Sequence, residues 1–324
     1  MEQVIIIGGG PCGLSAAVEC KRAGLDPLII EKGSLVHSIY LYPTYLVFHS
    51  TPELLEIGGI PFTTPNEKPT RLEALTYYRM VAEREQLRVH TYETVVQVEG
   101  TKGAFSVHTE NRFGEKQTYT AKHIVIATGY FDRPNYMDVP GENLPKVSHF
   151  YQEAHPYSGM KVAIIGGKNS AVDAALDLVR VGAEVTVIYR KSELSPSVKP
   201  WMRPLFESAA AKGRIRVLWN SQVKEITERS VIVDHEGIVE TLDNDFVLAL
   251  TGFRPDRSFL GKLGVHLDEE NGAPEHHPET METNVPGLYI AGVIAAGGEA
   301  NAIFIENGRW HGKAIADHIR QQSE

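Results

Sequence analysis

The sequence is poor in cysteine: its 324 residues include only two, Cys12 and Cys20. Two cysteines are too few for a disulfide framework or for a cysteine-rich zinc site. If both lie on one helix, they are separated by about 12 Å along its axis, which is too far for a disulfide bond. The sequence therefore excludes a disulfide-stabilised fold and gives no sign of an internal redox-active pair of thiols.

Long hydrophobic runs and excess positive charge are missing too. No apolar stretch approaches the length that spans a bilayer, and no basic, apolar leader precedes the first expected strand. We therefore expect no membrane partner and a cytoplasmic location. The formal net charge is −9, which argues against general nucleic-acid binding. Hydrophobic residues make up 42% of the chain, as in globular proteins, and the length is enough for two domains.

What the sequence does contain is a glycine-rich turn after a short run of apolar, β-branched residues. That run predicts a buried parallel strand, and a helix is expected to follow the turn. A second apolar strand, 27–30, ends at Glu31, at the spacing where an acidic side chain binds a ribose hydroxyl. A plain β-α-β unit without a ligand is the alternative. The turn fits G-x-G-x-x-G, the pattern of dinucleotide sites, with Gly8, Gly10 and Gly13.

The same pattern returns in the middle of the chain. A strand is expected at 162–165, a glycine turn at 166–171 with a lysine in the middle glycine position, and a further strand at 185–189. This second unit ends in Arg190 and Lys191 instead of an acid. A basic pair suits the 2′-phosphate of NADPH, whereas an acid suits a ribose with free hydroxyls. The pairing predicts FAD at the first unit and NADPH at the second; an ordinary charged strand end is the alternative for the basic pair.

The predicted fold class is therefore α/β, with two Rossmann-like dinucleotide-binding domains. A helix is expected at 71–85, with Leu72, Leu75, Tyr78 and Val81 near one face, and a last helix at 299–315. Residues 33–70 are expected to be irregular. Further strands are expected at 89–98, 105–108, 119–128, 231–233, 246–250 and within 283–292.

Three more motifs accompany the two glycine turns: Ala127-Thr128-Gly129, the later Thr251-Gly252, and the closing run 286–292. Together they resemble the two-domain flavoprotein reductases of the thioredoxin reductase type. The resemblance implies an FAD domain built from 1–150 and 281–324, with an NADPH domain, 151–280, inserted between. It also implies a rotation between the domains, for which 134–145 and 275–286 are candidate hinges.

Several runs resemble a narrower group, the bacillithiol disulfide reductase family of low-GC Gram-positive bacteria. They are residues 8–13, 166–171, 199–201, 291–297 and 304–308. The resemblance implies an FAD-containing, homo-oligomeric enzyme in which NADPH drives reduction of the disulfide of bacillithiol, a small thiol used in place of glutathione. The residues expected at FAD are Gly8, Gly10, Pro11, Cys12, Gly13, Glu31, Lys32, Val95, Thr128, Gly129, Gly292 and Val293. Those expected at NADPH are Gly166, Lys168, Asn169, Ser170, Ala171, Tyr189, Arg190, Lys191, Thr251 and Gly252.

Two departures from the wider type affect the chemistry. Thioredoxin reductases carry Cys-x-x-Cys where this chain has His149-Phe150-Tyr151-Gln152, so exchange through that dithiol is excluded. Their closing glycine is followed by an acid that binds the ribityl chain of the flavin, but here Gly292 is followed by Val293.

Cys12 is the candidate catalytic residue, because the narrower resemblance implies an attacking thiol there. A helix N-terminus lowers a thiol pKa, whereas a neighbouring pyrophosphate raises it. The alternative is that Cys12 only fills a small-residue position; for Cys20, packing is the expected role. No metal site is expected, since the adjacent His276 and His277 diverge. His49, His149 and His155 are either proton donors to a leaving thiolate or ordinary loop histidines.

Three other functions fit the same scaffold. A ferredoxin- or flavodoxin-NADP reductase would need no cysteine, but it would need a basic docking surface. A flavin monooxygenase would carry a Phe-x-Gly motif before the histidine near 149, and this motif is missing. A redox sensor that binds FAD and NADPH without turnover has no supporting feature.

Overall fold

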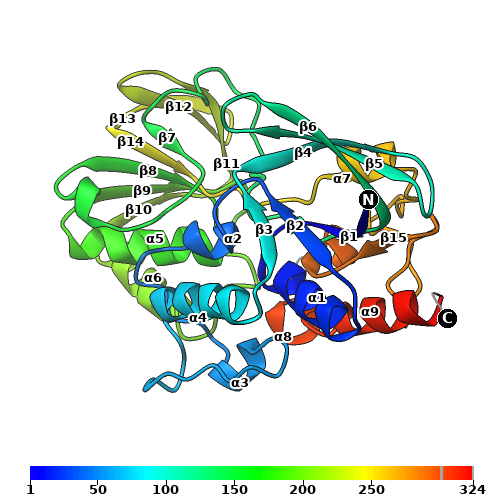
Figure 1. Ribbon diagram of the computed structural model, residues 1–324. Helices are drawn as coiled ribbons and strands as arrows, with labels where there is room; N and C mark the ends of the chain where they lie inside the picture. Colours follow the sequence, from blue (N-terminus) through cyan, green and yellow to red (C-terminus); the bar gives the residue numbers. More distant parts are fainter. Residues whose placement is uncertain (300–301, 323–324) are drawn as a thin grey trace. The chain divides into compact units, whose positions relative to one another are not determined.

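The computed structural model describes residues 1–299 and 302–322, which form two compact units (Figure 1). Unit 1 comprises 1–41, 45–133 and 254–324, and unit 2 comprises 42–44 and 134–253. The α/β fold with a middle unit inserted into the first is as predicted. The compact units divide at 133 and 253, and the cofactor domains 1–150 with 281–324, and 151–280, stay a prediction. Within the described part of the chain, none of the helices combines the length and apolar character needed to traverse a lipid bilayer.

Unit 1 contains a mixed seven-stranded sheet in which β1 is central. The buried residues Ile5 and Ile6 of β1 pair in parallel with β2 on one side and β6 on the other. The expected strand at 89–98 is two strands, interrupted at Tyr92, which has a left-handed φ of +57°. The order is β3 (Arg88–Thr91), β2 (Pro27–Glu31), β1 (Glu2–Ile7), β6 (Lys116–Ile126), β5 (Phe105–Asn111) and β4 (Glu93–Glu99), with β15 (Leu288–Ile290) paired to β6.

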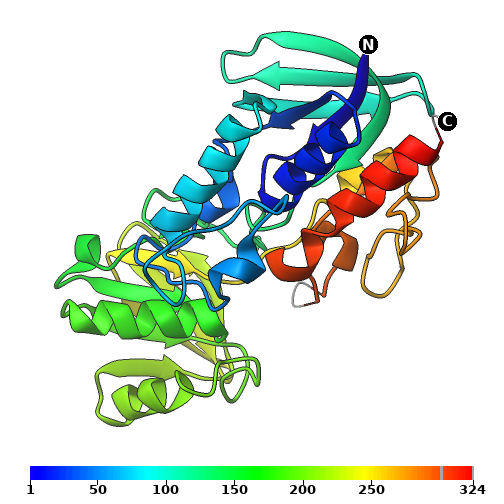
Figure 2. The ribbon, with the colours of Figure 1, turned by 60° about the horizontal axis from the view of Figure 1, so that its bottom comes forward.

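Helices α1 (Pro11–Arg22) and α9 (His311–Gln321) lie side by side in both views (Figures 1 and 2). Their close approach depends on Gly312, where a Cβ atom would lie 2.6 Å from the Cα atom of Ala16. The first and last helices of the chain are therefore joined in one layer against the sheet. The short helices of unit 1 are α2 (His37–Tyr40), α3 (Pro52–Leu55), α7 (Arg257–Lys262), η2 (Val293–Ala296) and α8 (Ile305–Gly308).

The helix expected at 71–85 is α4 (Arg71–Arg84), and its buried face agrees with the prediction only in part. Leu72 is 68% exposed. Tyr78 and Val81 are buried as predicted, and Tyr77 joins them in the buried face. The hydroxyl groups of Tyr77 and Tyr78 donate to the carbonyl groups of Ile60 and Leu55. The face is shifted because aromatic side chains that can satisfy their hydroxyl groups bury more area than leucine.

The single helix expected at 299–315 is also wrong. Residues 300 and 301 lie outside the described residues, and Ala302, Ile303 and Phe304 are not helical. The chain then forms α8 and α9 with a break at Arg309 and Trp310. Gly308 ends α8 where the backbone approaches the turn at Gly292, so a tertiary contact determines the break.

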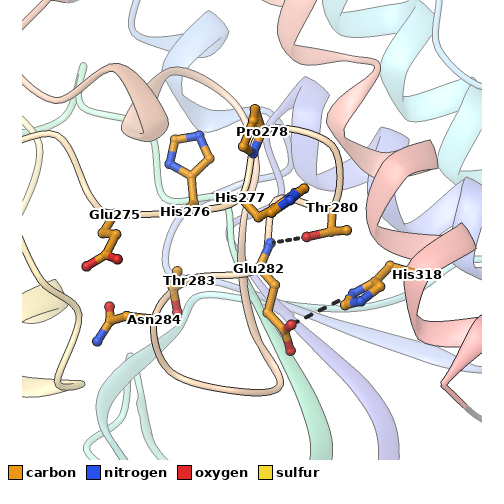
Figure 3. A pocket seen from close by; sticks show the side chains of 9 residues that line it. All are labelled: Glu275, His276, His277, Pro278, Thr280, Glu282, Thr283, Asn284 and His318. Atoms are coloured by element: carbon orange, nitrogen blue, oxygen red, sulfur yellow. Dashed lines mark hydrogen bonds and ion pairs between the residues drawn. The ribbon is translucent and has the colours of Figure 1, made fainter.

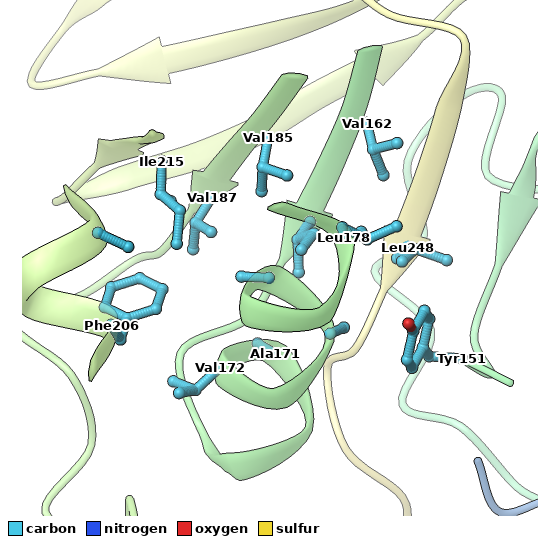
Figure 4. Packing of buried hydrophobic residues seen from close by; sticks show 14 of the residues in the cluster. Tyr151, Val162, Ala171, Val172, Leu178, Val185, Val187, Phe206, Ile215 and Leu248 are labelled. Carbon is cyan, nitrogen blue, oxygen red and sulfur yellow. The ribbon is translucent and has the colours of Figure 1, made fainter. Parts of the chain in front are cut away.

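Unit 2 is built on a five-stranded parallel sheet whose alternate residues serve two cores. Val162 and Ile164 face α5 (Asn169–Arg180) and α6 (Arg203–Ala211), where Leu178 and Phe206 fill the core (Figure 4). Ala163 and Ile165 face the opposite side, as the two-residue period of a strand requires. The sheet order is β10 (Ile215–Leu218), β9 (Glu184–Ile188), β8 (Lys161–Ile165), β14 (Phe246–Ala249) and β7 (Val147–Ser148). The remaining elements are the antiparallel β11 (Ser221–Ile226), β12 (Ser230–His235) and β13 (Ile238–Asp243), and η1 (His155–Tyr157).

Candidate functional site

The first glycine turn has the geometry of a dinucleotide site. Gly8 has φ +112°, and a Cβ atom there would lie 2.4 Å from the Ala127 carbonyl oxygen. A Cβ atom on Gly13 would lie 2.0 Å from the Gly8 carbonyl oxygen, so both positions require glycine for the fold. Gly10 differs, because its φ is −75° and a Cβ atom there would meet nothing within 4 Å. The open space faces the start of α1, which carries no acidic residue in its first turn, and it fits a pyrophosphate.

Glu31 lies where the sequence places it, at the end of β2, and is only 7% exposed. Its two carboxylate oxygens accept the N–H groups of Gly9 and Gly33, each at 2.7 Å. A carboxylate oxygen can accept more than one hydrogen bond, so each oxygen keeps capacity for a ribose hydroxyl. The neighbouring Lys32 forms an ion pair with Asp132.

A buried polar atom without a partner lies close to the glycine turn. The Thr128 hydroxyl oxygen has no hydrogen-bond partner among the described residues, although buried polar groups normally have one. A Cβ atom on Gly8 would lie 3.1 Å from the Thr128 nitrogen, so the two residues are adjacent. Gly129 follows with φ +65°, and Val95 is half-buried on β4. The orphaned hydroxyl and the open face of Gly10 both fit a bound FAD.

Cys12 lies in the first turn of α1, against two glycines. Cβ atoms on Gly292 and on Gly308 would each lie 3.0 Å from its sulfur. Burial, and secondarily the carboxylate of Glu306, raises the pKa of the Cys12 thiol to about 12. Burial also raises the pKa of Cys20 to about 12. This arrangement favours the packing role for Cys12, because a thiol rather than a thiolate is present at neutral pH.

The turn after β15 is fixed by a histidine that the sequence did not single out. The N–H group of Gly292 donates to the Nδ1 atom of His311 at 3.2 Å. Burial lowers the pKa of His311 to about 4, so the ring is neutral and can accept this bond. Val293 begins η2. The pattern contained no signal for this contact, since the two residues meet only in the fold.

The second glycine turn repeats the geometry in unit 2. Gly166 has φ +147°, and a Cβ atom there would lie 2.5 Å from the Leu250 carbonyl oxygen and 3.3 Å from the Ala171 Cβ atom. The Tyr189 ring covers Gly167 so closely that a Cβ atom would overlap it at 2.4 Å. The exposed Lys168 precedes α5, and Ser170 is exposed in its first turn. A crowded turn that still presents free N–H groups fits a dinucleotide phosphate.

The side chain of Asn169, a residue expected at NADPH, forms hydrogen bonds with other residues of the protein. Its carbonyl oxygen accepts the N–H of Lys199, and its amide donates to the Ser197 carbonyl, both at 3.0 Å. The N–H of Ser195 donates to the Gly167 carbonyl at 3.0 Å. Loop 194–199 is therefore hydrogen-bonded to the second glycine turn. The sequence did not predict this contact.

The other residues expected at NADPH fall in two groups. Arg190 and Lys191 follow β9, are exposed, and form no ion pair with any described residue, so they are available for a 2′-phosphate. Thr251 and Gly252 follow β14 and form hydrogen bonds with Asn135. The Thr251 hydroxyl donates to the Asn135 carbonyl at 2.6 Å, and the Asn135 N–H donates to the Gly252 carbonyl at 2.8 Å.

Unit 1 also has a hollow of about 530 Å³ between the segment 275–284 and His318 (Figure 3). His276 and His277 project from it in different directions. Nowhere in 1–299 or 302–322 do three or more histidine, cysteine or acidic side chains gather in a way that would hold a metal ion. The hollow contains none of the residues expected at the cofactors.

Comparison with known proteins agrees with this geometry. Residues 5–292 match the family described as pyridine nucleotide-disulphide oxidoreductase. The chain belongs to this family. It is therefore an oxidoreductase, and the expected cofactors, FAD and NADPH, are those of the family. The residues at both glycine turns fit these two groups.

Similar proteins extend over the whole chain. "Bacilliredoxin reductase Bdr" of Bacillus subtilis (strain 168) is 54% identical over 99% of this chain and 98% of its own. The solved structure of "Bacillithiol Disulfide Reductase Bdr (YpdA)" from Bacillus cereus is 54% identical, covers 99% of both chains and has a TM-score of 0.95. Lactococcus lactis thioredoxin reductase, 21% identical with a TM-score of 0.76 over 99% of this chain and 98% of its own, shares the fold. The resemblance expected from the motifs is thus confirmed.

Proposed function

We propose that the chain reduces bacillithiol disulfide to two bacillithiol molecules with NADPH as the electron donor. One disulfide, one NADPH and one proton give two thiols and NADP⁺. The main support for this proposal is the 54% sequence identity, over 99% of both chains, to a structure titled bacillithiol disulfide reductase. The presence of only two cysteines, both on α1, supports a small disulfide as substrate, because the chain has no dithiol of its own to relay electrons.

We assign FAD to unit 1 and NADPH to unit 2. In unit 1, the open face of Gly10, the buried Glu31 and the orphaned Thr128 hydroxyl would hold the pyrophosphate, the adenosine ribose and a further polar group of FAD. In unit 2, Lys168, Arg190 and Lys191 would hold the phosphates of NADPH. Bound FAD would accept a hydride from NADPH and pass two electrons to the disulfide.

Cys12 has two candidate roles in this reaction. As a nucleophile it would attack one sulfur of the disulfide, release the first thiol and form a mixed disulfide. As a packing residue it would only allow α1, the turn at Gly292 and α8 to meet. The raised pKa and the close contact with Gly292 and Gly308 support the second role.

The test is anaerobic NADPH oxidation by the FAD-loaded protein with bacillithiol disulfide, with glutathione disulfide as the control. We expect turnover with bacillithiol disulfide alone, and retention of most of it in Cys12→Ala. Loss of turnover in the variant with normal FAD content would assign the attack to Cys12. Absence of any disulfide-dependent turnover in the wild type would refute the proposed function.

A protein disulfide is the second candidate substrate. The name of the Bacillus subtilis relative, bacilliredoxin reductase, specifies a protein rather than a small molecule. The same assay with an oxidised bacilliredoxin, with and without free bacillithiol, separates the two. Turnover that requires free bacillithiol supports the small disulfide as the direct substrate, and equal turnover without it supports the protein.

We also propose a cytoplasmic location and a homo-oligomeric state, with neither nucleic acid nor membrane as a partner. A pool of reduced small thiols is maintained inside cells, where disulfides are rare, and the net charge of −9 disfavours binding to polyanions. Light scattering of the FAD-loaded protein after size-exclusion chromatography measures the oligomeric state; a single species at the mass of one chain, 35.8 kDa, would contradict it.

A further inference from the structure

A buried carboxylate determines the path of the loop that leads to β7 in unit 2. Glu142 is 7% exposed, and its carboxylate accepts the N–H of Met137 at 2.9 Å and that of Asp138 at 2.8 Å. Asp138 has φ +57°, a left-handed conformation that is uncommon outside glycine, although aspartate adopts it more readily than most residues. The two charge-assisted bonds hold the loop in this shape.

His149, directly after β7, joins this carboxylate to the end of β14. Its Nδ1 atom lies 3.2 Å from the carbonyl oxygen of Ala249, and its Nε2 atom lies 3.6 Å from Glu142 Oε1. The Ala249 carbonyl oxygen is an acceptor, so the Nδ1 atom of His149 is the donor in this contact. The Tyr136 ring meets the imidazole edge-on, with ring centroids 4.9 Å apart. His149 and Glu142 thus form an enclosed pair of polar side chains, which are only 11% and 6% exposed.

The pair lies beside the crevice where a dinucleotide would bind. In the sheet order β10-β9-β8-β14-β7, the chain proceeds from β8 outward to β9 and β10 and then returns to the other side of β8 with β14. The topological switch point of the sheet therefore lies between β8 and β14, and ligands of such sheets bind outside the carboxyl ends of the strands at that point. Ala249 is the last residue of β14. Leu250, the next residue, has its carbonyl oxygen against Gly166 of the second glycine turn. The basic pair after β9 lies on the other side of β8 and fits the adenosine phosphate.

We propose that His149 and Glu142 are positioning residues for NADPH, which hold the 249–252 turn against the second glycine turn so that it forms the wall for the nicotinamide half. The inference rests on the proposed use of unit 2 by NADPH. His149 fixes the Ala249 carbonyl, and the bonds between Thr251, Gly252 and Asn135 fix the rest of the turn. Without the imidazole, the turn keeps only the Asn135 side of this support.

The test is stopped-flow reduction of the FAD-loaded protein by NADPH, which gives both the NADPH dissociation constant and the reduction rate. We expect His149→Leu to weaken NADPH binding or slow flavin reduction by about ten- to a hundredfold, because small displacements of a bound reactant have effects of this size. His149→Asn, which retains an amide donor for the Ala249 carbonyl, should recover part of the loss. FAD affinity should be unchanged in both variants, since FAD is assigned to unit 1.

The double variant His149→Leu/Glu142→Gln tests whether the defect of the single variant arises only from misfolding. Removal of one partner alone leaves a buried polar group without its partner, whereas the double variant removes the imidazole and makes the facing side chain neutral, so it should fold while keeping the NADPH defect. Glu240→Gln, which breaks the exposed Arg216–Glu240 pair in the same unit, is the control and should behave as wild type.

The outcomes separate the inference from the function on which it rests. If NADPH does not reduce the wild-type flavin, the proposed function fails. If it does, and the folded double variant binds NADPH and is reduced at wild-type rates, the positioning role is refuted. A defect in the double variant, or partial recovery in His149→Asn, supports it.

Discussion

Gly10 and Gly13 belong to one motif but are glycines for different reasons. A Cβ atom on Gly13 would overlap the Gly8 carbonyl, so we expect Gly13→Ala to destabilise the protein by about 1–3 kcal/mol through overpacking. A Cβ atom on Gly10 meets no protein atom, so Gly10→Ala should change the unfolding free energy of the FAD-free protein by less than about 0.5 kcal/mol. Its added methyl group would occupy the pyrophosphate space, and we expect at least about a tenfold loss of FAD affinity.

Urea unfolding of the FAD-free proteins and fluorescence titration with FAD measure the two effects separately. Wild-type FAD affinity in Gly10→Ala would show that the open face of this glycine does not receive the cofactor. Thermal stability alone would not reveal this difference, because bound FAD itself stabilises the folded state.

The two thiols provide a second prediction for single residues. Because folding raises the pKa values of both Cys12 and Cys20 to about 12, very little thiolate exists at pH 8. We expect iodoacetamide to modify the folded protein at least about a hundredfold more slowly than the protein unfolded in urea, since the thiolate is the reactive form. Mass spectrometry of the products measures this, with Cys20→Ala isolating the signal of Cys12. Rapid labelling of Cys12 at pH 8 would contradict the packing role and revive the attacking thiol.

At the scale of the element, the start of α4 is stabilised by a capping box. The Thr70 hydroxyl accepts the N–H of Glu73, and the Glu73 carboxylate accepts the N–H of Thr70 at 2.8 Å. Thr70→Ala should cost about 1 kcal/mol of unfolding free energy. Hydrogen bonds from Thr64 and then Thr70 lower the pKa of Glu73 to about 2. The stability from the ionised carboxylate is therefore fully present above pH 4.5 and is lost as the pH falls toward 2.

Urea unfolding of wild type and Glu73→Gln at pH 7 and pH 3 tests the sign. The difference between the two proteins should be largest at pH 7 and smaller at pH 3. A difference that grows on acidification would show that Glu73 does not stabilise the helix as a carboxylate.

The contrast between α4 and the last helices shows what local sequence can predict. The box at Thr70 and Glu73 is a local signal, and the helix expected at 71–85 is present. The helix expected at 299–315 is broken, because Gly308 must approach Cys12 and Gly292, which are distant in sequence. The glycine turns were predictable because their function depends on a fixed spacing. The hydrogen bond between His311 and Gly292 and the hydrogen bonds between Asn169 and loop 194–199 join residues that are distant in sequence. They could not be predicted because only the fold brings these residues together.

At the scale of the whole molecule, the same limit explains the unit boundaries. The two-unit organisation follows from two glycine motifs, but the motifs do not locate the points near 133 and 253 where the compact units divide. β7 is only two residues long and has no readable period, yet it pairs with β14 and brings residues before 150 into unit 2. Residues 254–280 contain no long strand or helix, and only their contacts show that they belong to unit 1.

The chain leaves and re-enters unit 1 at neighbouring residues, which leads to the last prediction. The Arg254 N–H donates to the Arg133 carbonyl at 3.0 Å, and Arg133 pairs with Asp256. Residues 133 and 254 can therefore be joined by a short glycine linker. The two cores of unit 2 lie wholly within 134–253. We expect both pieces to fold: the linked unit 1 should bind FAD, and the excised 134–253 should bind NADPH alone.

Circular dichroism, cooperative urea unfolding and ligand titration of each piece measure these properties. The intact chain is the control, and NADPH should reduce the flavin of the intact chain but not that of the linked unit 1. The loss of Thr44, whose N–H donates to the Gln152 carbonyl of unit 2, should weaken the excised piece only slightly. Reduction of the linked unit 1 by NADPH, or FAD binding by the excised piece, would refute the assignment of one cofactor to each unit. Failure of 134–253 to unfold cooperatively would instead show that its two cores need unit 1 for stability.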